Sequence, residues 1–208
     1  TLAYIERLSS VFIETGTVLR GRTLGLFTSY DMMRQVGALI EEPLRAAGVR
    51  LLMQGSGESR DFITRRFRTD EQYVLLGTHS FWEGVDVVGE ALSCVIMARL
   101  PFAAVGDPII EARSEQIDRR GGSSFRELSL PNAVMKFRQG FGRLIRSAAD
   151  RGLVVIADPR IVTKGYGATF RKSLPCGVIA LKEQTELEGH LQWNKQGEIN
   201  ETENHLDR

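Results

Sequence analysis

The chain has 208 residues, of which 42% are hydrophobic and 25% charged, and its formal net charge at pH 7 is +1. This composition excludes a disordered protein or a coiled coil, and the length supports a full core without metal or disulfide staples. Two cysteines, Cys94 and Cys176, exclude a disulfide framework, a four-cysteine zinc site and a four-cysteine iron–sulfur cluster within the chain. The apolar runs are too short to span a bilayer and no signal sequence opens the chain. Because the first residue is Thr1, we expect a fragment of something longer.

Charge divides the chain into two parts. Residues 1–182 carry 25 basic and 19 acidic side chains, whereas residues 183–208 carry seven acids against Lys195 and Arg208. A basic body favours polyanions such as nucleic acid or nucleotide phosphate, although this charge is also common in proteins that bind neither. We therefore expect one domain over residues 1–182 and a polar, acidic and mobile tail over residues 183–208.

Helical and strand patterns alternate along the body. An apolar stripe predicts an opening helix over residues 1–15, and Ser29 is placed to cap a second helix that Pro43 ends, kinks or restarts. The further helices are expected over residues 60–68, 107–120 and 131–147. Short runs rich in Leu, Val and Ile predict strands over residues 22–28, 49–54, 71–78, 91–98 and 151–157, with a sixth strand at 176–182.

This alternation predicts an α/β domain whose mostly parallel sheet is covered by helices on both faces. Ligands of such sheets collect at the carboxyl ends of the strands. The segments to examine are therefore TSYD, QGSGES, THSFWEGVD, RLPF and DPRIVTKGYG.

The helix expected over residues 131–147 carries one polar stripe. At roughly 100° per residue, Gln139, Arg143 and Arg146 share a face opposite the apolar side chains. Guanidinium groups suit phosphate oxygens, but an ordinary solvated basic face has the same pattern. Gly140 and Gly142 weaken a helix and allow another backbone or a ligand to approach closely.

Two strand-end segments carry further candidates. In THSFWEGVDVVG, Glu83 and Asp86 could bind a ribose, metal-bound water or the arginines, and Gly84 could let the backbone approach the ligand closely. Alternatively, Phe81 and Trp82 belong to the core and Asp86 caps a turn. QGSGES could cradle a phosphate with backbone N–H groups, but glycine turns are common connectors. The sequence contains neither a GxxxxGK[ST] loop nor an adjacent acidic pair after a strand, so it lacks a triphosphate cradle.

Five sequence motifs follow one another along the chain in this order: GRTLGLFTSYDMM, LLGTHSFWEGVDVVG, LPF followed by GDPIIEAR, QGFGRLIRS, and DPRIVTKGYGATFRKSLP. Over residues 1–182 they resemble the second motor domain of DinG/XPD-like superfamily-two DNA helicases, closest to the bacterial DinG group. The resemblance implies a RecA-like, three-layer α/β/α domain of the P-loop NTPase type that lacks the P-loop itself. It also implies a first motor domain that holds ATP and Mg²⁺, together with any iron–sulfur cluster.

The resemblance implies roles for individual positions. Arg143 and Arg146 match arginines that reach the γ-phosphate across the cleft, and Gln139 matches a residue that senses it. Glu83, Gly84 and Asp86 match positions that couple the nucleotide to DNA, and together with Gly142 they are the expected nucleotide-binding residues. The expected DNA contacts are Thr28, Ser29, Tyr30, Gln54, Ser80 and Trp82. Trp82 or Tyr30 would stack on a base if its ring is exposed.

The sequence therefore predicts the C-terminal motor domain of an ATP-dependent, 5′→3′ DNA helicase. Its expected partners are single-stranded DNA and the first motor domain, with no membrane, in the cytoplasm at the nucleoid. By itself the chain should be inactive. The alternatives are a non-catalytic nucleic-acid- or phosphate-binding module of the same fold, the helicase-like half of a DinG-type exonuclease, and a stand-alone Rossmann-like enzyme that uses QGSGES.

Overall fold

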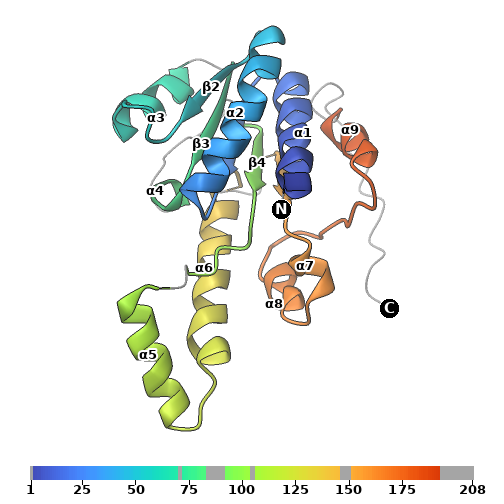
Figure 1. Ribbon diagram of the computed structural model, residues 1–208. Helices are drawn as coiled ribbons and strands as arrows, with labels where there is room; N and C mark the ends of the chain where they lie inside the picture. The colour runs from blue at the N-terminus through green and yellow to red at the C-terminus, as the bar shows by residue number, and fades with distance from the viewer. Residues whose placement is uncertain (1, 70–71, 83–91, 104–105, 146–150, 193–208) are drawn as a thin grey trace.

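A parallel sheet forms the middle layer of the computed structural model, which describes residues 2–69, 72–82, 92–103, 106–145 and 151–192 (Figure 1). All four strand pairings are parallel, and the strand order is β2-β3-β1-β4-β5. In the central pairings Thr23 lies opposite Val74 of one neighbour and Cys94 of the other. The strands are β1 (Thr23–Leu26), β2 (Arg50–Met53), β3 (Tyr73–Gly77), β4 (Cys94–Met97) and β5 (Leu153–Ile156).

Helices cover both faces of this sheet because nearly every strand residue is apolar. Leu75 and Val95 point to one face, while their neighbours Leu76 and Ile96 point to the other. One face is covered by α1 (Leu2–Val18), α2 (Tyr30–Ala46) and α9 (Thr185–Leu191). The other face is covered by α3 (Arg60–Thr69), α4 (His79–Trp82), α6 (Leu130–Phe141), α7 (Arg160–Thr163) and α8 (Gly167–Lys172). The expected three-layer α/β/α fold is confirmed.

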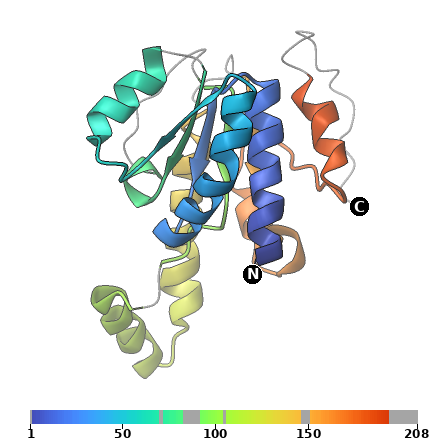
Figure 2. The same ribbon diagram turned by 45° about the horizontal axis from the view of Figure 1, so that its top comes forward.

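An arm of residues 106–135 projects beyond the carboxyl edge of the sheet (Figures 1 and 2). It consists of α5 (Pro108–Arg119), a π-helical turn η1 (Phe125–Ser129) and the first half of α6. Asp107 caps α5 by accepting from the N–H groups of Ile109 and Ile110 at 3.0 and 3.2 Å. From Gly106 to Asn132 no side chain is buried, so this part of the arm contributes no buried residue to either core.

The N-terminal half follows the sequence expectations closely. Ser29 caps α2, since its Oγ accepts from the N–H of Met32 at 3.3 Å. Pro43 neither ends nor restarts α2, which continues to Ala46. Proline is accommodated there because it lies in the last turn, close to the point where the chain turns at Gly48 (φ 77°).

Three expectations for the C-terminal half are wrong. The helix expected to reach residue 147 ends at Phe141, with Gly142 as its C-cap, because Gly140 and Gly142 weaken the helix at this point. Residues 176–182 form no strand; they are largely exposed, Ile179 by 62%, and pass from α8 on one face of the sheet to α9 on the other. The tail expected from residue 183 forms α9 instead over Thr185–Leu191.

The reason for α9 is packing on the core. Leu187 and Leu191 are four residues apart, so they share one face of the helix. Both are buried against the α1 and α2 side of the sheet, with exposed fractions of 3% and 0%. Residues 193–208, the remainder of the expected tail, lie outside the described residues.

Candidate nucleotide and nucleic-acid interface

The side chain of Gln54 joins the ends of β1, β2 and β3 at the carboxyl edge of the sheet. Its Oε1 accepts from the N–H of Thr78 at 2.7 Å and from the Thr78 hydroxyl at 3.0 Å. Its Nε2 donates to the Ser80 hydroxyl at 3.0 Å and also to the Tyr30 hydroxyl. Three of the five segments singled out in the sequence, TSYD, QGSGES and THSFWEGVD, therefore meet at one place.

Most of the expected DNA-contacting residues present polar groups at this edge. Thr28 and Tyr30 are exposed, Tyr30 by 47%, while Ser29, Gln54 and Ser80 are half-buried. The Tyr30 ring lies over Gly55, where an added Cβ would be 3.9 Å from its Cε1 atom. Because its hydroxyl is held by Gln54, the Tyr30 ring is presented to solvent in a fixed orientation.

Trp82 belongs to the core and not to this surface. Its side chain is 1% exposed, and its indole N–H donates to the carbonyl of Phe27 at 3.0 Å. The expectation that its ring stacks on a base is therefore wrong, and the alternative that Phe81 and Trp82 are core is confirmed. The physical reason is that α4 turns the ring inward beneath the end of α6, against Gly140.

Gly140 makes room for the Trp82 ring. A Cβ at Gly140 would lie 2.8 Å from Cζ3 of Trp82 and 3.0 Å from the Cε of Met97. The close approach expected at this glycine is thus made by an indole of the same chain. Gly142 has a different part, since it caps α6 by donating its N–H to the carbonyl of Arg138 at 2.9 Å.

Arg143 follows this cap in a turn, outside the helical stripe expected from the sequence. Its Nε and Nη2 donate to the main-chain carbonyl of Trp82 at 3.0 and 2.8 Å. Gln139 lies exposed in the last turn of α6. Both residues therefore lie near the end of α6 that adjoins α4. Gln139 belongs to the helix and Arg143 to the turn after it, so they do not share one helical face as expected. Arg146, Glu83, Gly84 and Asp86 lie outside the described residues.

A second cluster at the carboxyl ends of β4 and β5 was not among the expected site residues. The side chain of Asp158 is fully buried and accepts from the N–H of Leu100 at 2.9 Å and from the Arg160 guanidinium at 2.6 Å. The Tyr4 hydroxyl donates to the carbonyls of Ala98 and Ala157, and the Arg99 guanidinium lies 3.7 Å from the Tyr4 ring centroid. The available signal was an aspartate directly after a strand with an arginine two residues later.

Burial and hydrogen bonding act on these groups in opposite directions. Burial raises the pKa of Tyr4 to about 12, against the smaller lowering effect of Arg99. Burial also disfavours an ionised Asp158, but the hydrogen bonds from Arg160 and from the Leu100 N–H outweigh it and hold the pKa of Asp158 below its ordinary value. Asp158 is therefore an ionised carboxylate that fastens the segment after β4 to the segment after β5.

Among the residues that the structure describes, His, Cys, Asp and Glu form no group of three that could hold a metal ion. Likewise, no helix in the described part of the chain is long and apolar enough to cross a membrane.

The fold resembles the motor domains of solved helicases. An XPD helicase aligns with a TM-score of 0.63 at 17% identity, over 83% of this chain and 30% of that one. The Dbp5 protein of S. cerevisiae, bound to RNA and ADP BeF3, aligns with a TM-score of 0.54 at 16% identity, over 88% of this chain and 41% of that one. At these identities the likeness shows the RecA-like fold alone.

Sequence comparison identifies the family. The model of the helicase C-terminal domain matches residues 13–177, and the chain belongs to this family. The 3′-5′ exonuclease DinG of Bacillus subtilis (strain 168) is 42% identical over 84% of this chain and 19% of its own length. The ATP-dependent DNA helicase YoaA of Haemophilus influenzae (strain ATCC 51907 / DSM 11121 / KW20 / Rd) is 41% identical over 82% of this chain and 26% of its own length. The resemblance to the C-terminal domain of DinG/XPD-like proteins is thereby confirmed, and the chain spans about a fifth to a quarter of these relatives.

We predict that Gly140→Ala destabilises the fold, since the new Cβ meets the rigid Trp82 ring. Overpacking against a rigid ring costs up to about 3 kcal/mol, which exceeds the gain of about 1 kcal/mol in helix propensity. Urea unfolding followed by circular dichroism measures the change. Gly165→Ala is the matched control, because an added Cβ there meets nothing within 4 Å. Equal stability of the two variants would contradict the packing described.

The lowered pKa of Asp158 predicts a pH-dependent stability. A carboxylate whose pKa is lower in the folded than in the unfolded chain stabilises the fold above its unfolded pKa, and this contribution is lost as the pH falls through the folded value. Asp158→Asn should lower the free energy of unfolding at pH 7 by about 1–3 kcal/mol, and the difference should shrink below about pH 4. Urea titrations at several pH values test this, with the exposed Asp61→Asn as control. A difference that stays constant with pH would refute it.

Proposed function

We propose that this chain is the second, C-terminal motor domain of an ATP-dependent DNA helicase of the DinG group. The observation that carries the proposal is the place of Arg143. Its guanidinium is held against the carbonyl of Trp82 at the carboxyl edge of the sheet, beside the polar cluster around Gln54. Membership of the helicase C-terminal domain family and relatives named ATP-dependent DNA helicases support it.

In this proposal ATP and Mg²⁺ are held mainly by a first motor domain on the same polypeptide, and this chain completes the site from across a cleft. Arg143 and Arg146 then act as arginine fingers, because a guanidinium stabilises charge that develops on the transferred phosphoryl group. Gln139 senses the nucleotide, and Glu83, Gly84 and Asp86 couple it to DNA. A guanidinium and an amide at the end of α6 fit phosphate oxygens, whereas the sequence supplies no cradle for a triphosphate.

The polar edge around Gln54 is the proposed DNA track. Thr28, Ser29 and Ser80 offer hydroxyl groups to phosphate or sugar, and the exposed ring of Tyr30 offers a stacking surface to a base. Closure of the two motor domains would move this track along single-stranded DNA with 5′→3′ polarity.

A second candidate is the helicase-like part of a DinG-type exonuclease. The relative from Bacillus subtilis is named a 3′-5′ exonuclease, and this chain covers only 19% of it. Strand cleavage assays on the full-length protein, with and without ATP, separate the two candidates. Nucleotide release from a 3′ end without ATP-dependent unwinding would favour the exonuclease.

The arginine role predicts a large loss of turnover. In the full-length protein, Arg143→Ala should lower DNA-stimulated ATP hydrolysis on the order of 10³-fold, while ATP binding changes far less. Arg143→Lys should rescue poorly, since an ammonium lacks the planar fork. The control is Arg138→Ala, an exposed arginine in the last turn of α6. Near-normal ATPase activity of the Arg143→Ala variant would show that this arginine has a structural part only.

The chain by itself should hydrolyse no ATP and bind it weakly at best. The sequence has no GxxxxGK[ST] loop and no acidic pair after a strand, so triphosphate and Mg²⁺ lack their usual ligands. Isothermal titration calorimetry with ATP–Mg²⁺ and a phosphate-release assay check both statements. Turnover by the purified 208-residue chain would favour a stand-alone enzyme.

Tyr30 should contribute to binding of single-stranded DNA. Removal of one stacked ring costs about 1–3 kcal/mol, so Tyr30→Ala should weaken binding by about 5- to 150-fold. Tyr30→Phe keeps the ring and loses only the contact with Gln54, and it should bind nearly as the unaltered protein does. Fluorescence anisotropy with an oligonucleotide at two salt concentrations measures both. Equal affinity of all three proteins would exclude stacking by Tyr30.

A further inference from the structure

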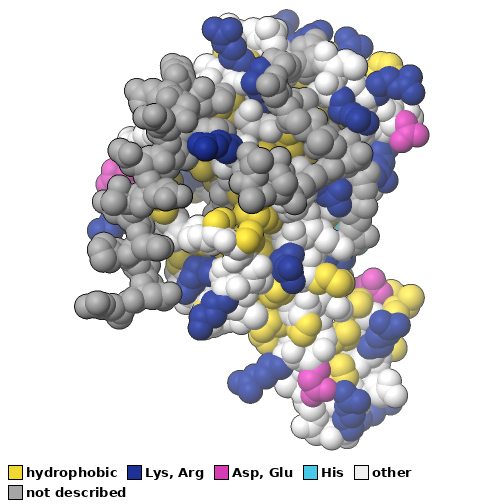
Figure 3. All heavy atoms as spheres, turned by 180° about the vertical axis from the view of Figure 1, so that it is seen from behind, with side chains coloured by type: hydrophobic (Ala, Val, Ile, Leu, Met, Phe, Trp, Pro, Cys, Tyr) yellow, Lys and Arg dark blue, Asp and Glu magenta, His cyan; other side chains and the backbone are white. Residues whose placement is uncertain are grey.

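The arm of residues 106–135 presents apolar side chains to solvent. Ile109 of α5 is 65% exposed and Met135 of α6 is 53% exposed. The space-filling view shows yellow apolar side chains gathered on the arm (Figure 3). Between its helices lies a hollow lined by apolar side chains such as Ile110, Leu128 and Met135 and by the polar side chains of Ser129, Asn132 and Lys136.

The two helices of the arm are anchored to different extents. At the start of η1, the Phe125 ring packs on Phe102 and Tyr166 of the main body, with centroids 6.0 and 5.3 Å apart. In contrast, α5 has 12 residues and none of them is buried. An isolated helix of that length is marginal in water, and helices in proteins are stabilised mainly by packing of an apolar face. The exposed ion pair between Glu115 and Arg119 contributes little. Within the described ranges, therefore, no packing partner buries a residue of α5.

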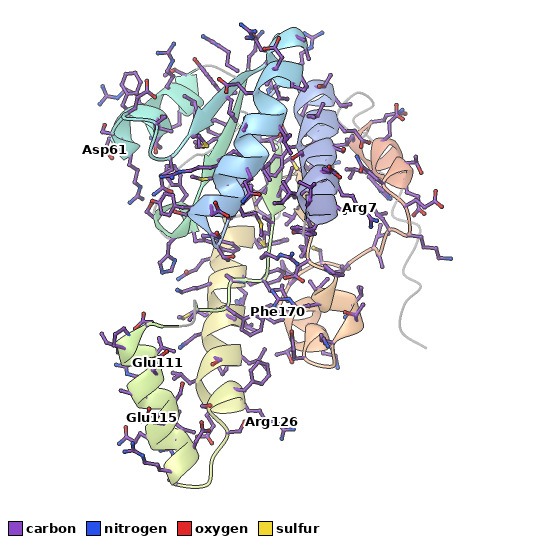
Figure 4. All side chains as sticks on the ribbon, viewed as in Figure 1. Arg7, Asp61, Glu111, Glu115, Arg126 and Phe170 are labelled. Atoms are coloured by element: carbon purple, nitrogen blue, oxygen red, sulfur yellow. The ribbon has the colours of Figure 1, made fainter. Side chains whose placement is uncertain are left out.

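The charges of the arm disfavour nucleic acid as such a packing partner. Five acidic and four basic side chains lie between residues 107 and 129, in a body with an excess of six basic side chains. Figure 4 shows Glu111 and Glu115 along α5, with Arg126 at the far end of the arm. A surface of mixed charge around an apolar hollow is typical of contact with protein, whereas nucleic-acid sites are strongly positive.

We propose that the hollow between α5 and α6 receives an apolar segment of the same polypeptide from outside these 208 residues. This rests on the proposed function, in which the chain is one domain of a longer helicase. The matched relatives are about four to five times longer than the part aligned with this chain. The arm also projects from the carboxyl edge that carries Gln54 and Arg143, where the remaining polypeptide would face this domain.

The helix α6 connects the hollow to the end of the helix that carries Gln139. Its first half lines the hollow through Asn132, Met135 and Lys136, and its last turn holds Gln139 and Gly140 beneath the nucleotide-facing end. A segment seated in the hollow would therefore bear on the same rigid element that positions Gln139.

Thiol labelling tests the proposal without any activity assay. Met135→Cys, at a residue that lines the hollow, and Ile109→Cys, on α5 next to the lining residue Ile110, are made in the 208-residue chain and in the full-length protein. N-ethylmaleimide modification of each site is followed by peptide mass spectrometry. Leu39→Cys, on the exposed face of α2 at 45% exposure, is the matched control. In the 208-residue chain all three should react at similar rates. In the full-length protein both arm cysteines should react at least about tenfold more slowly, with Leu39→Cys unchanged, because protection follows the opening of the contact.

Each other outcome overturns the proposal. Equal arm labelling in the two proteins means that no segment covers the hollow. Slow labelling in the 208-residue chain that depends on its concentration means that a second copy covers it. Equal slowing at Leu39 means general shielding of the domain. Because the labelling reaction does not depend on ATP, it tests the contact in the hollow independently of whether the full-length protein is a helicase.

Discussion

Trp82 is the residue on which the geometry of the carboxyl edge depends. Its indole N–H bonds to Phe27 at the end of β1, its ring fills the space left by Gly140, and its carbonyl accepts both hydrogen bonds from Arg143. One residue thus ties the ends of β1, β3 and α6 together. A buried aromatic ring can orient a surface guanidinium in this way because its side chain and its main chain face different partners.

Much of the fold could be predicted from the sequence because the strands are nearly continuous apolar runs and therefore lie inside. The meeting of Tyr30, Gln54 and Ser80 followed from the same fact, since the carboxyl ends of parallel strands share one edge. The sequence identified those residues as candidates, whereas the hydrogen bonds between them are seen only in the structure. Their contact with DNA remains a prediction.

The errors have two causes. The helical periodicity that grouped Gln139 with Arg143 assumed a continuous helix, but Gly140 and Gly142 weaken the helix locally and it ends at Phe141. Tertiary packing decided the other two cases. Trp82 follows a strand end, where exposed and buried rings look alike in sequence, and α9 lies in a polar, acidic segment whose two leucines are buried on the core. In these two cases the deciding contacts are made by residues far away in the sequence.

The proposed function requires that Arg143, held on the Trp82 carbonyl, faces the γ-phosphate of ATP bound elsewhere on the longer polypeptide. The decisive test is a structure of the full-length protein with a non-hydrolysable ATP analogue, Mg²⁺ and single-stranded DNA. We expect guanidinium nitrogens of Arg143 within about 2.7–2.9 Å of γ-phosphate oxygens. An Arg143 that remains on Trp82 and contacts no phosphate in the closed complex would contradict it.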